Sequence, residues 1–160
     1  MNDLEDLYRE RRTDLVRAAV LLLDDRAAAE EVVQDAFVSL YRAFPRLRDR
    51  STAGGYLYRT VVNNCRSHLR RQASVRRRPF SVVEDAPGAD RAVLASERKE
   101  AVVAALAALP QRQRECAVLR WYLDLPEREI AESLGISAGS VKTHLHRGRA
   151  ALAEALEVLR

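Results

Sequence analysis

The side chains best suited to recognition chemistry lie between residues 138 and 158, where donors and cations repeat at helical spacing. At 100° per residue, one side of such a helix holds Val141, Leu145, Gly148 and Leu152. The rest of the surface carries donors for base edges, with cations and a further imidazole on the flanks: Ser140, Lys142, Thr143, His144, His146, Arg147 and Arg149. This pattern is typical of a recognition helix in the major groove of DNA. A solvated polar face on an ordinary helix is the alternative.

The segment before this helix predicts how the helix is held. Pro126 can begin a short helix over 127–134, because a missing N–H has no cost in the first turn. Gly135 can end it in the left-handed conformation that glycine adopts without strain. Ser137 can cap the next helix by accepting a backbone N–H. Two short helices joined by such a turn form a helix-turn-helix.

A second cationic face is predicted on a helix over residues 56–72. Its apolar side is opposite a stripe that spans about 60° by the helical period and contains Arg59, Asn63, Arg66 and Arg70. No acid interrupts the stripe, and Tyr56 lies at its edge. Cations in a line can follow a nucleic-acid backbone. A solvated basic helix is the alternative interpretation.

A helix over residues 25–44 carries the opposite charge on its outer side. Glu31, Gln34 and Asp35 surround Val38 there, and an exposed valine among acids favours contact with another protein. A stray surface valine is equally compatible with the pattern. Pro45 ends this helix, and a polar loop with a glycine pair is expected over 46–55.

Composition narrows the class of protein. The 160 residues carry a net charge of +4, and residues 41–78 hold eleven arginines against the single acid Asp49. No apolar run approaches the length of a membrane span or forms a signal peptide, so a cytoplasmic protein without membrane insertion is expected. Cys65 and Cys116 have no metal-ligand spacing and are interpreted as core residues. With no catalytic grouping either, we expect a non-enzymatic protein without cofactor or metal.

The remaining pattern is helical and divides the chain in two. Residues 76–96 contain Pro87-Gly88, show no clear period and are predicted to form an interdomain linker. Four helices are expected after it, over 97–108, 111–123, 127–134 and 138–158. The predicted fold class is all-α, with two small helical domains joined by a flexible linker.

These motifs, in this order, resemble the extracytoplasmic-function sigma factors, group 4 of the sigma-70 family of RNA polymerase specificity subunits. Residues 25–37 (DRAAAEEVVQDAF) resemble the polymerase-binding helix of the sigma-2 domain, and residues 56–64 (YLYRTVVNN) resemble the helix that reads the −10 element. Residues 109–115 (LPQRQRE) and 126–149 resemble the sigma-4 domain, which reads the −35 element. The alanine and arginine bias is similar to the actinobacterial SigE-like group. Tyr56 and Ser67 depart from the family's usual Trp and Asp.

The resemblance implies a sigma-2 helical bundle over 1–75, a linker over 76–96 and a four-helix sigma-4 domain over 97–160. It implies polymerase binding by Glu30, Glu31, Gln34, Asp35 and Val38. It implies single-stranded −10 binding by Tyr56, Arg59, Asn63, Arg66 and Arg70. It implies duplex −35 binding by Ser140, Lys142, Thr143, His144, His146, Arg147 and Arg149. The implied partners are core RNA polymerase, promoter DNA and an anti-sigma factor, and the free protein is expected to be a monomer.

A helix-turn-helix activator of the LuxR type is the alternative function. Residues 130–145 would suit its effector domain closely. Such activators usually carry a sensory or receiver domain in front, and a receiver alternates strands with helices. Residues 1–73 show only helical patterns, which favours the sigma factor.

Overall fold

A computed structural model of the chain describes residues 2–75 and 91–157, and every regular element within these ranges is a helix. The first half contains α1 (Asn2–Leu23), α2 (Arg26–Ala43), two short 3₁₀ turns (Phe44–Arg46 and Arg50–Thr52) and α3 (Ala53–Val75). The second half contains α4 (Arg91–Ala108), α5 (Gln111–Ala117), a π-helical turn (Val118–Tyr122), α6 (Glu127–Leu134) and α7 (Ala138–Glu157). The all-α fold class is therefore confirmed.

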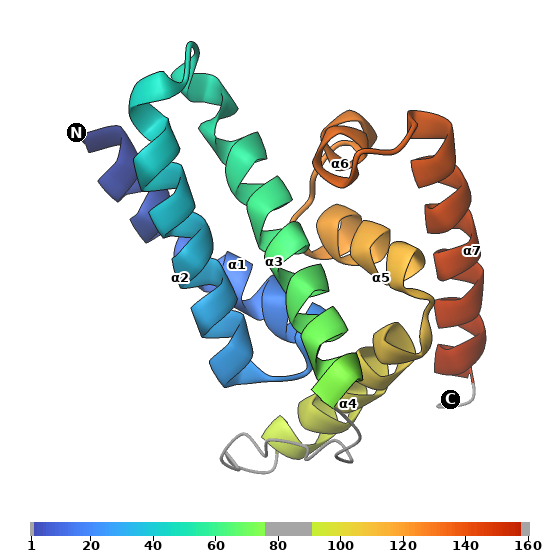
Figure 1. Cartoon of the computed structure of the whole chain (residues 1–160). Coiled ribbons are helices and arrows are strands. Elements are labelled where there is room, and N and C mark those ends of the chain that lie inside the picture. Colours follow the sequence, from blue (N-terminus) through green and yellow to red (C-terminus); the bar gives the residue numbers. More distant parts are fainter. Residues whose placement is uncertain (1, 76–90, 158–160) are drawn as a thin grey trace.

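The helices α1, α2 and α3 form a bundle (Figure 1), and the sides that face one another are apolar. Leu15, Leu40 and Leu57, one from each helix, are almost completely buried. Asp25 caps α2 by accepting the Ala28 backbone N–H at 3.1 Å, as the sequence predicts. Burial of one face on each helix therefore builds a core, which continues into the second half of the chain at Cys116 and Ile130.

The polar loop expected over 46–55 is shorter in the structure, because α3 begins at Ala53. Asp49 caps the preceding turn by accepting the Ser51 N–H at 2.9 Å, and Ala53 is buried. Gly54 and Gly55 lie in the first turn of α3. Glycine weakens a helix by about 1 kcal/mol without forbidding its backbone, so capping and burial set the helix start rather than the glycine pair.

Two boundaries in the second half also differ from the prediction. Helix α4 begins at Arg91 instead of residue 97, since residues 92–95 are alanine, valine and leucine and continue the helix. The predicted linker over 76–96 therefore contains six helical residues, and its part over 76–90 lies outside the described residues. The helix expected over 111–123 leaves the α-helical register after Ala117.

The change of register after α5 occurs at the centre of the second half (Figure 1). Residues 115–119 are all buried, which a surface helix with one apolar face would not allow. The wider turn that follows closes with a bond from the Leu123 N–H to the Val118 carbonyl at 3.1 Å. No proline or glycine marks it, so periodicity could not predict it.

The helix-turn-helix forms as predicted. Gly135 ends α6 with φ 67° and ψ 35°, and the Ile136 N–H bonds back to the Ala131 carbonyl at 3.1 Å. Ser137 Oγ accepts the Ser140 backbone N–H at 3.0 Å and so caps α7. Among the described helices, none is long and apolar enough to cross a membrane.

Candidate nucleic-acid interface

The outer side of α7 is open to solvent. Val141, Leu145 and Gly148 are buried, as the helical period predicts. The predicted contact residues are exposed at five positions and half-buried at Ser140 and His144: Lys142, Thr143, His146, Arg147 and Arg149. The structure thus brings these side chains together around one helix, while their contact with −35 DNA stays a prediction.

These side chains differ in their local contacts, so that some already make hydrogen bonds within α7 and its cap while others are open to an external ligand. Ser140 is bonded to Ser137, with 2.9 Å between the two hydroxyl oxygens, and Thr143 Oγ1 donates to the Gly139 carbonyl at 3.0 Å. Lys142 and Arg147 make no ion pair with any residue of the described part of the chain. Their charged groups are therefore available to a partner.

Arg149 has an aromatic neighbour that the sequence did not reveal. Its guanidinium carbon lies 5.7 Å from the centroid of the Trp121 ring, in the π-helical turn. An arginine over the face of a tryptophan is attracted by the ring's quadrupole. The contact restrains Arg149 on the flank of α7.

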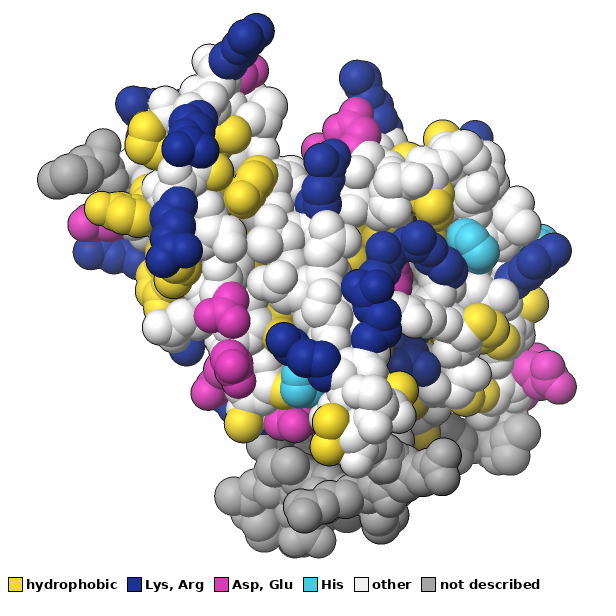
Figure 2. All heavy atoms as spheres, in the orientation of Figure 1, with side chains coloured by type: hydrophobic (Ala, Val, Ile, Leu, Met, Phe, Trp, Pro, Cys, Tyr) yellow, Lys and Arg dark blue, Asp and Glu magenta, His cyan; other side chains and the backbone are white. Residues whose placement is uncertain are grey.

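The predicted protein-contact face on α2 is exposed to solvent. Glu31, Gln34, Asp35 and Val38 all lie at the surface, and Val38 is 42 % exposed. Glu30 is exposed as well and pairs with Arg26 at 3.4 Å. Figure 2 shows acidic side chains over this helix.

The α3 stripe is divided by its contacts. Asn63 and Arg70 are exposed, and Tyr56 is half-buried. Arg59 donates to the backbone carbonyl of Glu132 at 3.1 Å. Arg66 is paired with Glu115 on α5. Two of the three predicted cations thus contact the other half of the chain, Arg66 from a partly buried position and Arg59 while it stays exposed to solvent.

Glu115 is a functional candidate that sequence reasoning missed. Arg66 Nε lies 3.0 Å from Glu115 Oε1 and Arg66 Nη2 lies 2.5 Å from Oε2, so the pair is bidentate. Arg112 Nη1 lies 3.3 Å from the same carboxylate. The Glu115 side chain is only 3 % exposed. The sequence offered one signal for this role. Glu115 precedes Leu119 by four residues, which places an acid on the apolar side of α5.

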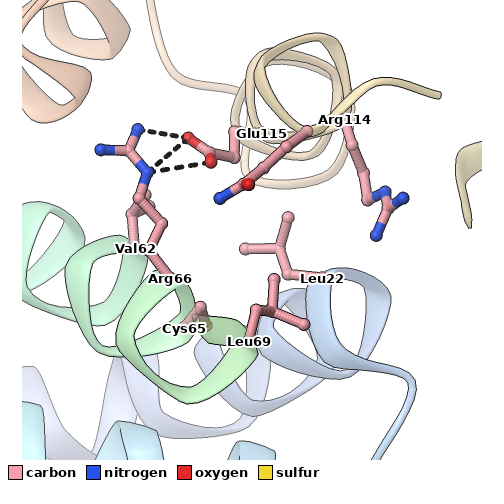
Figure 3. Close-up of a pocket in the computed structure, with 8 residues that line it drawn as sticks. Leu22, Val62, Cys65, Arg66, Leu69, Arg114 and Glu115 are labelled. Carbon is pink, nitrogen blue, oxygen red and sulfur yellow. Dashed lines mark hydrogen bonds and ion pairs between the residues drawn. The ribbon is translucent and has the colours of Figure 1, made fainter. Parts of the chain in front are cut away.

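Apolar side chains lie on one side of this pair, in a pocket that Gln111 and Arg114 also line (Figure 3). Leu22 and Leu69 lie beside it, and dark blue side chains gather over the junction of α3 and α5 in Figure 2. Arg114 points away from the pair in Figure 3 and donates to the Leu106 and Leu109 carbonyls, at 3.0 and 3.1 Å. Arg114 therefore completes the C-terminal end of α4, and burial lowers its pKa.

Both cysteines are buried close to this charge. Burial raises the pKa of Cys65 to about 12 and that of Cys116 also to about 12, and the negative charge of Glu115 adds to both shifts. The thiols are thus protonated core groups, as predicted. In the part of the chain that the structure describes, no three acidic, histidine or cysteine side chains are grouped to hold a metal.

Two protein-family models match this chain, one in each half. Residues 7–75 match the family model for sigma-70 region 2, and residues 99–152 match the model for sigma-70, region 4. The RNA polymerase sigma-E factor of Streptomyces avermitilis is 32 % identical, over 97 % of this chain and 86 % of that protein. The ECF RNA polymerase sigma factor SigM of Mycobacterium tuberculosis is 34 % identical, over 97 % of this chain and 78 % of that protein.

Solved structures agree with this likeness. CnrH, in a complex with the cytosolic domain of CnrY, is 25 % identical and superimposes with a TM-score of 0.73, over 97 % of this chain and 88 % of that one. The sigma factor RpoE from Bartonella quintana, in a complex with the anti-sigma factor NepR, has a TM-score of 0.74 at 22 % identity. That alignment covers 98 % of this chain and 99 % of RpoE, and it shows a shared fold.

Proposed function

Since the chain belongs to the extracytoplasmic-function sigma factors of RNA polymerase, we propose that it contacts core enzyme through α2, single-stranded −10 DNA through α3 and duplex −35 DNA through α7. The LuxR-type alternative is wrong, because residues 7–75 match sigma-70 region 2. We assign residues 1–75 to the sigma-2 domain and residues 97–160 to the sigma-4 domain. The protein acts with polymerase in the cytoplasm and catalyses no reaction of its own.

The exposed side of α7 is the observation that carries this proposal. The turn at Gly135 and the Ser137 cap fix where α7 begins. Its inner side is anchored by Val141 and Leu145. The base-edge donors and flanking cations of the outer side are then presented as one rigid unit, which is how helix-turn-helix proteins enter a major groove.

The proposed −10 contacts combine cations with stacking groups. Arg59, Arg66 and Arg70 can follow the phosphates of one strand, and the Asn63 amide can bond to a base edge. An unstacked base can be held beside residues 46–55, where Arg48 and Arg50 are exposed. Opening DNA costs about 1.4 kcal/mol per base-pair step. A few such contacts can offset the cost of opening several base-pair steps only when core enzyme contributes contacts as well.

The proposed polymerase contact uses the acidic side of α2. Glu31, Gln34, Asp35 and Val38 present charge around an exposed apolar group, a composition suited to a basic and partly apolar surface. We expect an anti-sigma factor to bind this chain as well, because the sigma factor RpoE was solved with one. The free chain is expected to be a monomer.

A reconstituted transcription assay tests the function. The protein is added to core RNA polymerase without any other sigma factor, on templates whose start sites have been mapped after its overexpression. We expect transcripts from the mapped starts, and none from core enzyme alone. Transcription that requires a second sigma factor would identify an activator instead and contradict the proposal.

A further inference from the structure

We propose that the groove between α3 and the start of α5 is a binding site for condensed phosphate, either as the inorganic ion or as the phosphate tail of a nucleotide. Arginines from both helices line this groove, and dark blue side chains gather over the same junction in Figure 2. The site goes beyond the proposed contacts with DNA and polymerase, and its occupancy is measurable on the free protein.

The groove has the size of a small-molecule site. Its volume is about 470 Å³, and pockets that bind small ligands generally measure about 300–1,000 Å³. The α3 wall consists of residues three or four positions apart, which one face of a helix presents together: Arg66, Leu69, Arg70 and Ala73. Gln111, Arg112 and Glu115 form the opposite wall, on α5.

Positive charge exceeds negative charge in this groove. Three guanidinium groups and one carboxylate line it, so two positive charges are not balanced there. The carboxylate of Glu115 accepts from Arg66 at both oxygens and from Arg112 at Oε2, and it is only 3 % exposed. Arg70 is exposed and makes no ion pair with any residue that the structure places. An anion that enters the groove therefore meets unbalanced cations.

The carboxylate uses only part of each guanidinium group. Arg66 donates to it through Nε and Nη2, and Arg112 through Nη1. A guanidinium carries five N–H donors, and within the described ranges Arg66 Nη1 and Arg112 Nε and Nη2 have no hydrogen-bond partner. Glu115 Oε2 lies 2.5 Å from Arg66 Nη2 and 3.3 Å from Arg112 Nη1. The buried carboxylate thus holds two arginines side by side and leaves donors on both.

This arrangement of donors suits a chain of phosphates. The planar fork of arginine matches phosphate oxygens as it matches a carboxylate. Arg70 follows Arg66 by one helical turn, where side chains on a helix surface are neighbours. Two or three linked phosphates can therefore contact Arg70 together with Arg66 and Arg112. Leu69 and Ala73 add apolar surface on the same wall, against which the base of a nucleotide can pack.

The groove overlaps the proposed −10 face only in part. Arg66 and Arg70 belong to both, whereas Gln111 and Arg112 lie on α5 and take no part in the proposed DNA contacts. Substitutions of Gln111 and Arg112 therefore report on the groove alone.

Titration calorimetry of the full-length protein with inorganic tripolyphosphate, in a buffer without divalent metal, tests the site. Arg112→Gln should weaken binding by about tenfold or more, the effect of losing one hydrogen bond between charged groups. Arg120→Gln is the matched control, because the Arg120 side chain is also 39 % exposed, pairs with Asp124 and lies outside the groove. This control should bind tripolyphosphate as the wild type does.

Gln111→Glu is a second variant that should keep its fold. Gln111 is exposed at the first residue of α5, where a negative charge suits the helix. The added charge should weaken tripolyphosphate binding at least as much as Arg112→Gln does. Gln72→Glu, at an exposed position of α3 outside the groove, is its control. Circular dichroism and the melting temperature show that each variant is folded.

Adenosine triphosphate, titrated under the same conditions, identifies the source of the phosphate. Affinity equal to or below that for tripolyphosphate would assign the groove to the phosphate chain alone. Higher affinity would assign it to a nucleotide whose base packs beside Leu69 and Ala73. Either result supports a site for condensed phosphate.

Three results would overturn the inference. The first is no saturable binding by the wild type at up to about 1 mM tripolyphosphate, the weak end of the affinity scale. The second is unchanged binding in both groove variants. The third is an equal loss in the groove variants and their controls, which would show only a general attraction to a basic protein. Transcription by the wild type with core enzyme is measured separately, so these results do not depend on the proposed function.

Discussion

The Arg149 guanidinium carbon lies 5.7 Å from the centroid of the Trp121 ring, so a cation of α7 rests on the π-helical turn that follows α5. Trp121 is 38 % exposed. A Cβ on Gly148 would lie 3.9 Å from the same ring, in ordinary contact. The irregular turn thus places an aromatic face beside the helix that we assign to the major groove, and restrains one of the cations that we propose to bind phosphate.

Replacing this ring should weaken binding without changing specificity. Trp121→Leu removes the attraction for Arg149 and keeps an apolar contact with α7. A contact of this kind at a partly exposed site contributes about 0.5–1 kcal/mol, so we expect duplex −35 affinity to fall roughly two- to fivefold, which is the same energy expressed as an equilibrium ratio.

The measurement uses fluorescence anisotropy on −35 duplexes with the protein bound to core enzyme. Tyr122→Leu is the matched control, because Tyr122 is equally exposed at 39 % and does not stack on Arg149. Equal losses for the two variants would assign the effect to the turn as a whole.

Arg147 and Lys142 should separate base reading from phosphate binding. Arg147 makes no ion pair with any residue in 2–75 or 91–157 and lies at the centre of the exposed side of α7, where its fork can take guanine O6 and N7. Arg147→Ala should cost about 1–3 kcal/mol at one base pair and relax preference there. Lys142→Ala should weaken all sequences alike and reduce the salt slope by about one.

A saturation library of the −35 element, selected with holoenzyme carrying each variant, distinguishes the two roles. A uniform loss for Arg147→Ala, combined with a base-specific loss for Lys142→Ala, would mean that α7 is rotated in the groove relative to our assignment.

Reversing the charge of α2 should prevent association with polymerase. Glu31→Arg with Asp35→Arg keeps both positions exposed on the helix, so folding should not change. Like charges at an interface cost several kcal/mol, which corresponds to a loss of affinity of about a hundredfold or more. Biolayer interferometry with immobilised core enzyme measures this loss.

The pair Asp6→Arg and Glu10→Arg is the control for this experiment. These acids are also exposed and one turn apart, on α1. Undiminished binding by the α2 variant would remove the assignment, and an equal loss in both pairs would show only a dependence on net charge.

Local features of the fold were predictable because their causes lie within a few residues. The helix-turn-helix was predicted from Gly135, Ser137 and the helical period of Val141 and Leu145. Each of these residues behaves in the structure as expected. The Asp25 cap is of the same kind. Capping and helical period act over one or two turns, so a single sequence records them.

The contact between the halves was not predictable in this way. A helix face without acids was interpreted as solvated or bound to nucleic acid, because helical period compares a residue only with its own segment. The acid that meets Arg66 is Glu115, 49 residues later. The π-helical turn is similar in this respect, since it begins at Val118, within the buried run 115–119 at the centre of the second half. Such features depend on packing between elements.

The two buried thiols should make the protein sensitive to alkaline pH. Burial, with the nearby Glu115 charge, raises the pKa of Cys65 and Cys116 from 9.0 to about 12 in the folded chain. Between these values the unfolded chain loses thiol protons that the folded chain retains. The folded state then binds more protons, so its stability falls as pH rises. This contribution is intact below about pH 9 and is lost progressively toward pH 12.

We therefore expect the melting temperature to fall above pH 9, and less steeply in a Cys65→Ala and Cys116→Ala double variant. Alanine leaves small cavities that lower stability at every pH, so the slopes are compared instead of the absolute values. Calorimetry from pH 7 to pH 11 gives both slopes, while arginine and lysine titration contributes equally to the two proteins. Identical slopes would mean that the thiols ionise as readily in the folded chain as in the unfolded one, which their burial and the adjacent carboxylate should prevent.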